Sequence, residues 1–132
     1  MKRPSVLVVE DQKDNLRLID VVLRSAGYDV RLASDADAAL TELRRRRPSM
    51  LLMDLQLPGM DGLELTRRIK GDPATGDIPI VAYTAYAMPG DAEQALAAGC
   101  DDYLAKPAPI ATLLEKIAKY ADQTPAPNRK RA

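Results

Sequence analysis

Short apolar runs and amphipathic segments alternate five times along this chain, and this alternation limits the fold more than any other feature. The apolar runs contain mostly valine, isoleucine, leucine and methionine, as strands do when helices cover both faces of their sheet. They lie at 6–9, 28–33, 50–53, 80–83 and 103–105. Each is followed by apolar residues three or four apart, such as Leu16, Ile19 and Leu23, a spacing typical of helices. Strict alternation of this kind predicts an α/β fold, a parallel sheet with helices on both faces.

Residues that favour helix ends mark the boundaries of the predicted helices. Ser34 and Asp35 are typical of an N-cap, and Pro89 suits a first helical turn. Glycine or proline follows most of the periodic segments, and both residue types stop helices. The predicted helices end at Gly27, before Pro48, by Gly71, at Gly99 and at Tyr120.

The composition excludes several classes of protein. The chain has no histidine and one cysteine, Cys100, so it cannot build a histidine-based triad, a histidine metal site or an internal disulfide. Its 19 basic and 19 acidic residues cancel, which leaves no global field that would attract nucleic acid or an anionic membrane. No apolar run approaches the roughly 20 residues of a membrane helix. We therefore expect a cytoplasmic protein with no nucleic-acid and no membrane partner.

A length of 132 residues suits a single domain. The last predicted helix ends near residue 120, and beyond it the chain carries prolines and cations without an apolar anchor. We expect one domain over 1–121 and a disordered basic tail over 122–132.

Polar side chains follow four of the five predicted strands at the point where each strand ends. They are Glu10, Asp11, Asp54, Thr84 and Lys106. Each alone has about an even chance of being solvated loop surface. The carboxyl ends of parallel strands meet at one edge of the sheet, which is where open α/β folds bind ligands. The convergence of three carboxylates, a hydroxyl and an amine predicts a functional site there.

Three neighbouring carboxylates repel one another by roughly 4 kcal/mol per pair at 4 Å and an effective dielectric constant near 20. A hard divalent cation relieves this repulsion, and oxygen ligands favour Mg²⁺ over zinc or copper. The Lys106 ammonium and the Thr84 hydroxyl suit the oxygens of a phosphoryl group. Asp54 ends the central apolar run and is the best candidate for a carboxylate nucleophile.

At this point the residues match a known family. About residues 4–120 resemble the response-regulator receiver domain of two-component signalling. Four segments carry the resemblance, and together they are highly specific: 9–11 (VED), 53–62 (MDLQLPGMDG), 84–85 (TA) and 103–107 (YLAKP). The resemblance implies a flavodoxin-like (CheY-like), doubly wound sheet of five parallel strands in the order 2-1-3-4-5, with five helices. It is closest to stand-alone, single-domain regulators of the DivK type.

The resemblance also implies a role for each site residue. Asp54 would be the phosphoacceptor, and Mg²⁺, for which Mn²⁺ can substitute, would bind Glu10, Asp11, Asp54 and the backbone carbonyl of Gln56. Thr84, Ala85 and Lys106 would bind the phosphoryl group, with a cis bond between Lys106 and Pro107. Thr84 and Tyr103 would form the switch pair, and Gln56 and Tyr86 would tune dephosphorylation. Because neither Gln56 nor Tyr86 can orient water as an acid does, we expect slow loss of phosphate.

The implied protein accepts a phosphoryl group from a histidine kinase or a histidine phosphotransferase and signals to a downstream protein through the face of its fourth helix, fifth strand and fifth helix. It would be a monomer or a weak dimer, and not an enzyme beyond its own phosphotransfer and slow autodephosphorylation. Two positions depart from the family pattern. Gln12 replaces the asparagine common in the subgroup, and Tyr83 is bulkier than the usual aliphatic residue, so its side chain would alter the output surface if it faced the final helix.

Other interpretations remain open. An aspartyl-phosphate phosphatase would carry a second aspartate two residues after the nucleophile, where this chain has Gln56. A phosphorylation-independent adaptor would have lost Asp54 or Lys106, and a receiver excised from a hybrid histidine kinase or a larger regulator would look the same as this chain. The run of arginines at 44–47 fits a solvated helix end better than a nucleic-acid site, because cations suit the C-terminal end of a helix dipole.

Overall fold

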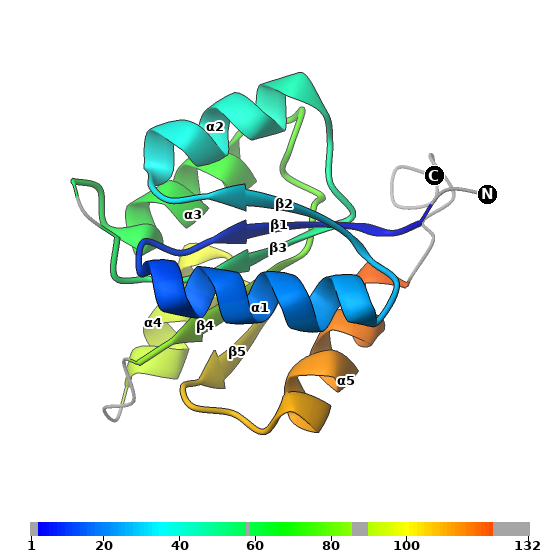
Figure 1. The fold of residues 1–132 in the computed structure, drawn as a ribbon. Coiled ribbons are helices and arrows are strands. Elements are labelled where there is room, and N and C mark those ends of the chain that lie inside the picture. The colour runs from blue at the N-terminus through cyan, green and yellow to red at the C-terminus, as the bar shows by residue number, and fades with distance from the viewer. Residues whose placement is uncertain (1–2, 58, 86–89, 123–132) are drawn as a thin grey trace.

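The computed structural model describes residues 3–57, 59–85 and 90–122, and arranges them as alternating strands and helices (Figure 1). The strands are β1 (Ser5–Val9), β2 (Asp29–Ala33), β3 (Met50–Met53), β4 (Ile80–Thr84) and β5 (Asp102–Ala105). The helices are α1 (Lys13–Ser25), α2 (Ala36–Arg45), α3 (Gly62–Gly71), α4 (Asp91–Ala98) and α5 (Ile110–Ala121). None of these helices has both the length and the hydropathy needed to cross a bilayer.

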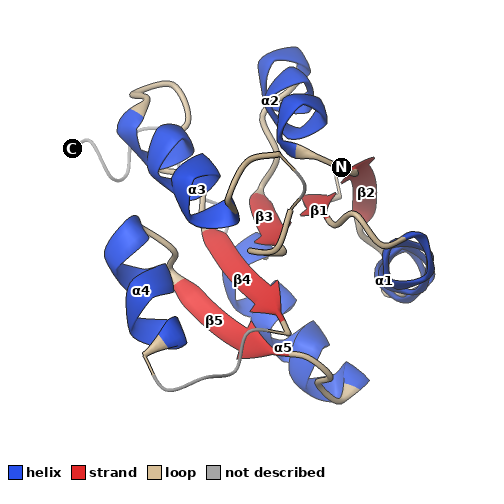
Figure 2. Ribbon diagram, turned by 90° about the vertical axis from the view of Figure 1, so that its left-hand side faces the viewer, coloured by secondary structure: helices blue, strands red, loops and turns tan. Residues whose placement is uncertain are grey.

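The strands form one parallel sheet in the order β2-β1-β3-β4-β5. In the register, Val6 of β1 lies between Val30 of β2 and Met50 of β3. Helices α1 and α5 cover one face, and α2, α3 and α4 cover the other (Figure 2). The predicted fold class and strand order are confirmed.

The central strands β1 and β3 are almost entirely apolar, with Ser5 as the one polar residue, because helices cover both of their sides. Alternate residues of β1 enter two separate cores: Leu7 and Val9 pack beneath α2, α3 and α4, whereas Val6 and Val8 pack beneath α1 and α5. Every residue of β1 and β3 is buried. A strand buried on both faces has no polar side to alternate with, which explains the continuous apolar runs in the sequence.

Several element boundaries differ slightly from the prediction. The second strand begins at Asp29 and not at Tyr28, because the Tyr28 N–H still closes the turn after α1 by donating to the Leu23 carbonyl at 3.1 Å. Helix α2 ends at Arg45, and the chain is already extended at Arg46, before Pro48. The Asp35 cap is confirmed, since its carboxylate accepts from the Ala38 N–H at 2.8 Å. Helix α4 begins at Asp91, and Pro89 lies outside the described residues.

Candidate functional site at the carboxyl edge of the sheet

The predicted site residues meet at the edge that Figure 2 presents to the viewer. Glu10 and Asp11 follow β1, Asp54 follows β3 and Lys106 follows β5, while Thr84 is the last residue of β4. Because β1 and β3 are neighbours in the sheet, Glu10 and Asp11 lie beside Asp54. One carboxylate oxygen from each of the three lies within 4.8 Å of the others. We call these three residues the acidic cluster.

Backbone hydrogen bonds fix the acidic cluster to the sheet. The Asp54 N–H donates to the Val9 carbonyl at 2.9 Å, which extends the pairing of β1 with β3 by one residue. The carboxylate oxygen Oδ1 of Asp54 accepts from the Gln56 N–H at 3.0 Å. In the same way, Oε2 of Glu10 accepts from the Gln12 N–H at 3.1 Å. The two loops therefore orient their carboxylates through their own amides.

Lys106 supplies the positive charge of the site. Its ammonium contacts Oε1 of Glu10 and lies 3.2 Å from Oδ2 of Asp54. The backbone of Lys106 is held by its own N–H, which donates to the Thr84 carbonyl at 2.9 Å, and its bond to Pro107 is cis, as the resemblance implies. One cation thus bridges carboxylates from two different strands.

Burial and charge shift the pKa values of this pair. Burial raises the pKa of Glu10, whose side chain is 1% exposed, and this effect exceeds the opposing effect of its hydrogen bond to Lys106. Burial alone would lower the pKa of Lys106. The hydrogen bond to Glu10 and the charge of Asp54 outweigh it, so the pKa of Lys106 lies above its ordinary value. Lys106 is therefore held as an ammonium between two acids.

The donor set of the acidic cluster fits a hard divalent cation. All three ligand groups are carboxylates, and Mg²⁺ prefers oxygen ligands and few protein ligands. Glu10 and Asp54 are buried whereas Asp11 is exposed, so the cluster opens toward solvent at Asp11. A cation held there would remain accessible to solvent on that side.

The remaining predicted residues lie around this cluster. Thr84 is fully buried at the end of β4, and Ala85 next to it is exposed. The Tyr103 ring packs against the core beneath α2, α3 and α4, and its hydroxyl is buried without a hydrogen-bond partner among the described residues. Burial and the charge of Asp91 raise the pKa of this hydroxyl. Gln56 is exposed, and Tyr86 lies outside the described residues, as does the predicted tail from residue 123 onward.

Two features of the site were missed or left open by the sequence. A Cβ added to Gly62 would lie 2.5 Å from the Leu55 Cα and 2.9 Å from the Asp54 carbonyl oxygen, so only glycine lets α3 begin this close to the loop after β3. The sequence offered one indication of this role, which is that Gly62 lies only eight residues after Asp54. Tyr83 packs on the α1 and α5 side of the sheet, with its ring centroid 5.4 Å from the Lys106 ammonium.

Fold and site together define a CheY-like α/β domain with an acidic cluster that could hold a cation, and a lysine beside it, at the carboxyl edge of its sheet. Residues 6–118 match the family model of the response regulator receiver domain. The chain belongs to this family, and the resemblance inferred from its motifs is confirmed. It is therefore a receiver domain of two-component signalling, a class of signalling phosphoacceptors and not of conventional enzymes.

Relatives and solved structures agree with this assignment. The polar-differentiation response regulator DivK of Brucella anthropi is 38% identical over 116 residues, which cover 88% of this chain and 94% of DivK. The receiver domain of sensor histidine kinase PA1611 from Pseudomonas aeruginosa is 38% identical, with a TM-score of 0.84 over 93% of this chain and all of that one, and holds a magnesium ion in its active-site cleft. Chemotaxis protein CheY4 of Vibrio cholerae has a TM-score of 0.84 at 26% identity, over 89% of this chain and 98% of that one.

Proposed function

We propose that this chain is a single-domain response regulator in which Asp54 accepts a phosphoryl group from the phosphohistidine of a histidine kinase or histidine phosphotransferase. The observation that carries the proposal is the placement of Asp54, which lies beside two further carboxylates and 3.2 Å from the Lys106 ammonium. This arrangement supplies a nucleophile, a metal site and a cation for phosphoryl oxygens within one edge of the sheet.

The two carboxylate oxygens of Asp54 have different surroundings. Oδ1 accepts from the Gln56 N–H, and Oδ2 faces Lys106. In the proposed transfer, one Asp54 oxygen bonds to phosphorus as the bond between phosphorus and the histidine nitrogen breaks, and the imidazole leaves with that electron pair. Mg²⁺ bound by Glu10, Asp11, Asp54 and the Gln56 carbonyl would neutralise the charge on the carboxylate and phosphoryl oxygens, and Mn²⁺ would substitute for it.

Lys106 changes partners in this mechanism. Before transfer its ammonium neutralises Glu10 and Asp54, and after transfer it contacts an oxygen of the phosphoryl group on Asp54. Thr84, the last residue of β4, and Ala85 after it lie next to Lys106 and provide a hydroxyl and a backbone N–H for the remaining oxygens. The chain catalyses only its own modification and its slow hydrolysis.

The signal leaves the site through Thr84 and Tyr103, which we propose as the switch pair. Among the residues that the structure describes, the buried Tyr103 hydroxyl has no hydrogen-bond partner, a state that costs about 1–3 kcal/mol and can be relieved by a small movement. Movement of Thr84 toward the phosphate would change the packing of Tyr103 and the face formed by α4, β5 and α5. Inverting a 1:99 population requires roughly 5.5 kcal/mol, so the Lys106 and Thr84 contacts, at about 1–3 kcal/mol each, give partial activation.

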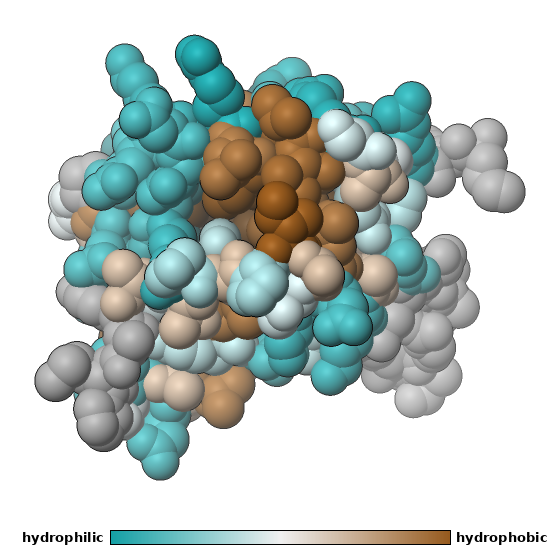
Figure 3. Space-filling view, turned by 60° about the horizontal axis from the view of Figure 1, so that its bottom comes forward, coloured by the Kyte–Doolittle hydropathy of each residue, from teal (hydrophilic) through white to brown (hydrophobic). Residues whose placement is uncertain are grey.

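The phosphodonor needs a docking face next to the carboxyl edge, and α1 begins at that edge directly after Asp11 and Gln12. Leu18 and Val21 on the outer side of α1 are each 57% exposed, and Ile110 at the start of α5 is 53% exposed. Figure 3 shows apolar side chains gathered on the side of the molecule that carries these two helices. Contiguous exposed apolar surface marks interaction sites, and we assign this one to the histidine-bearing donor.

Incubation with acetyl phosphate and Mg²⁺, followed by intact mass measurement, tests the proposal. The parent chain should gain the mass of one phosphoryl group, and Asp54→Asn should gain none. Asp61→Asn is the matched control, because Asp61 only caps α3 through the Leu63 N–H and asparagine keeps that cap. Labelling of Asp54→Asn would show that another residue is the acceptor. No labelling of the parent with either acetyl phosphate or a phosphorylated histidine kinase would favour a phosphorylation-independent adaptor.

Loss of the label reports on the residues beside the acceptor. Gln56 is exposed two residues after Asp54, and neither it nor Tyr86 is an acid that orients water. We expect slow loss of phosphate from the parent chain and faster loss from Tyr86→Glu. Equal or faster loss from the parent would show that these two positions do not control the rate.

A further inference from the structure

A cavity of about 280 Å³ lies between α2 and α3, away from the acidic cluster. Both helices contribute their last turns, which lie at the amino edge of the sheet because the helices run antiparallel to the strands (Figure 1). Leu40, Leu43 and Ile69 form its apolar lining, and Leu43 and Ile69 belong to the core beneath these helices. A cavity of about 150 Å³ holds benzene, so this one has room for a ring that bears a further group.

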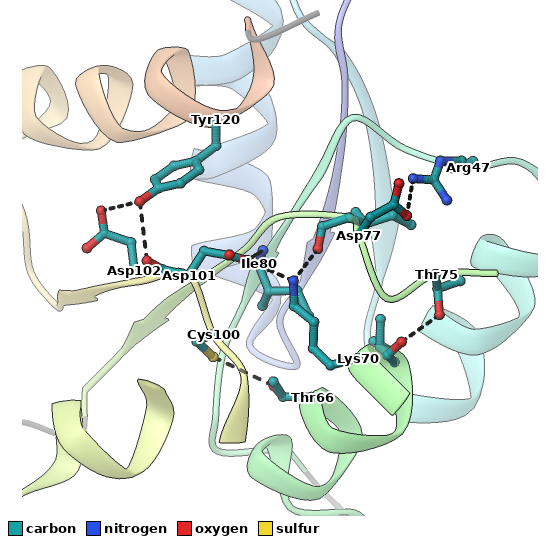
Figure 4. Close-up of polar contacts among 12 residues, drawn as sticks. Arg47, Thr66, Lys70, Thr75, Asp77, Ile80, Cys100, Asp101, Asp102 and Tyr120 are labelled. Atoms are coloured by element: carbon teal, nitrogen blue, oxygen red, sulfur yellow. Dashed lines mark hydrogen bonds and ion pairs between the residues drawn. The ribbon is translucent and has the colours of Figure 1, made fainter. Parts of the chain in front are cut away.

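The rest of the wall is a loop that its own hydrogen bonds hold in place. The Thr75 hydroxyl donates to the Ile69 carbonyl at 2.7 Å, and Oδ1 of Asp72 accepts from the Ala74 N–H at 2.9 Å. Arg47 donates to the Ala74 carbonyl at 2.7 Å and to Asp77 at 2.5 Å, as Figure 4 shows for the Arg47–Asp77 pair. A wall fixed in this way needs little further ordering when a ligand enters.

The charged side chains that line the cavity form no ion pairs with one another among the described residues. The Asp72 carboxylate accepts the hydrogen bond of the Ala74 N–H, and Arg47 forms an ion pair with Asp77. Arg44 makes no hydrogen bond or ion pair with any residue that the structure describes, and Arg68 has only an exposed contact with Glu64 at 3.4 Å. The helix dipole accounts for a cation at either helix end, but it does not explain why Arg44 and the weakly paired Arg68 both lie beside an apolar hollow.

We propose that this cavity binds a small amphipathic organic anion. Its apolar body would lie against Leu40, Leu43 and Ile69, and its phosphate or carboxylate group would lie between Arg44 and Arg68. Guanidinium groups suit both anions because their planar N–H groups donate in pairs. One residue of the arginine run at 44–47, Arg44, thereby obtains a binding role that is independent of phosphotransfer.

Titration of the isotope-labelled full chain with phenyl phosphate and with phenylacetate, followed by NMR without Mg²⁺, tests this site. We expect saturable shifts confined to residues 40–47 and 68–75, retained in Asp54→Asn. The double variant Arg44→Gln/Arg68→Gln should bind at least about tenfold more weakly, since it loses the charge-assisted hydrogen bonds to the anionic group. Arg45→Gln is the matched control, because Arg45 does not line the cavity and pairs with Glu42 at 2.9 Å.

The two probes and inorganic phosphate separate the possible outcomes. Tighter binding of phenyl phosphate or of phenylacetate identifies the anionic group that the cavity prefers, and both support the site. Inorganic phosphate should bind at least about tenfold more weakly than phenyl phosphate, because it cannot use the apolar lining. Absence of saturable shifts, unchanged affinity in the double variant, or equal affinity for inorganic phosphate would overturn the proposal.

Discussion

Replacing Lys106 with methionine should strengthen Mg²⁺ binding while it weakens the metal-free fold. The Lys106 ammonium is the cation that neutralises Glu10 and Asp54 in the structure described above. Methionine keeps most of the side-chain volume and removes the charge. Mg²⁺ would then bind the acidic cluster without having to displace a lysine from Glu10 and without repulsion from a neighbouring ammonium.

The magnitude follows from the geometry. At the 3.2 Å between the Lys106 ammonium and Asp54, Coulomb's law with an effective dielectric constant near 20 gives about 5 kcal/mol. When Mg²⁺ binds, the Lys106 ammonium loses its contact with Glu10 but stays close to Asp54. We therefore expect removal of the charge to improve the free energy of Mg²⁺ binding by a third to a half of this Coulomb energy. Because 1.4 kcal/mol is a factor of ten, Mg²⁺ should bind roughly tenfold to a hundredfold more tightly.

Isothermal titration calorimetry with Mg²⁺ measures the affinity, and urea unfolding with and without Mg²⁺ measures the stability. Without metal, Lys106→Met should lose about 3–5 kcal/mol, because the Glu10 and Asp54 side chains are only 1% and 7% exposed and would lose their shared cation. Saturating Mg²⁺ should restore much of this loss.

Two variants serve as controls for the charge effect. Lys106→Arg keeps the charge and should bind Mg²⁺ nearly as the parent does. Lys116→Met removes a lysine that pairs with Asp102 at 2.8 Å, outside the acidic cluster, and should leave the affinity unchanged. Equal or weaker Mg²⁺ binding by a folded Lys106→Met would refute the idea that the lysine and the metal compete.

Two further predictions concern stability. Gly62→Ala should cost at least about 2 kcal/mol in urea unfolding, because the new Cβ meets the Leu55 backbone at 2.5 Å, whereas Gly71→Ala has open space and should be neutral or slightly stabilising; equal effects would contradict this. Burial raises the pKa of Asp102, but its contacts with Lys116, the Tyr103 N–H and Tyr120 together outweigh burial and lower this pKa. The stabilising contribution of Asp102 is therefore present above the ordinary carboxyl pKa and is lost as pH falls through the lowered value. Asp102→Asn should therefore cost about 1–2 kcal/mol at pH 7 and less at pH 3, and a cost that does not change with pH would contradict this.

The fold could be predicted from the sequence because its pattern depends on local chemistry. Apolar runs such as 6–9 and 50–53 indicate strands that are buried on both faces, and Asp35 indicates the start of a helix. Errors were confined to boundaries such as Tyr28, where a turn hydrogen bond decides the last residue of an element. The convergence of Glu10, Asp54 and Lys106 also followed from strand ends alone.

Other properties of the site depend on distances that no local pattern contains. The bridging of Glu10 and Asp54 by one ammonium requires β1, β3 and β5 to be placed in space. The contact of Gly62 with the Leu55 backbone depends on where α3 starts relative to the loop after β3. The α2–α3 cavity likewise depends on how two helix ends and a loop pack, so the arginine run suggested only a solvated helix end.

The strands differ in how deeply they are buried. All four residues of β3 are buried, whereas all four residues of β5, at the margin of the sheet, are only half-buried. Asp54 thus follows a strand that is covered on both faces, whereas Tyr103 lies in the partly exposed β5 and Lys106 follows it. Segments with fewer buried contacts shift at a lower cost in free energy than the core does. A disturbance at this edge of the sheet should therefore displace β5 more readily than β3.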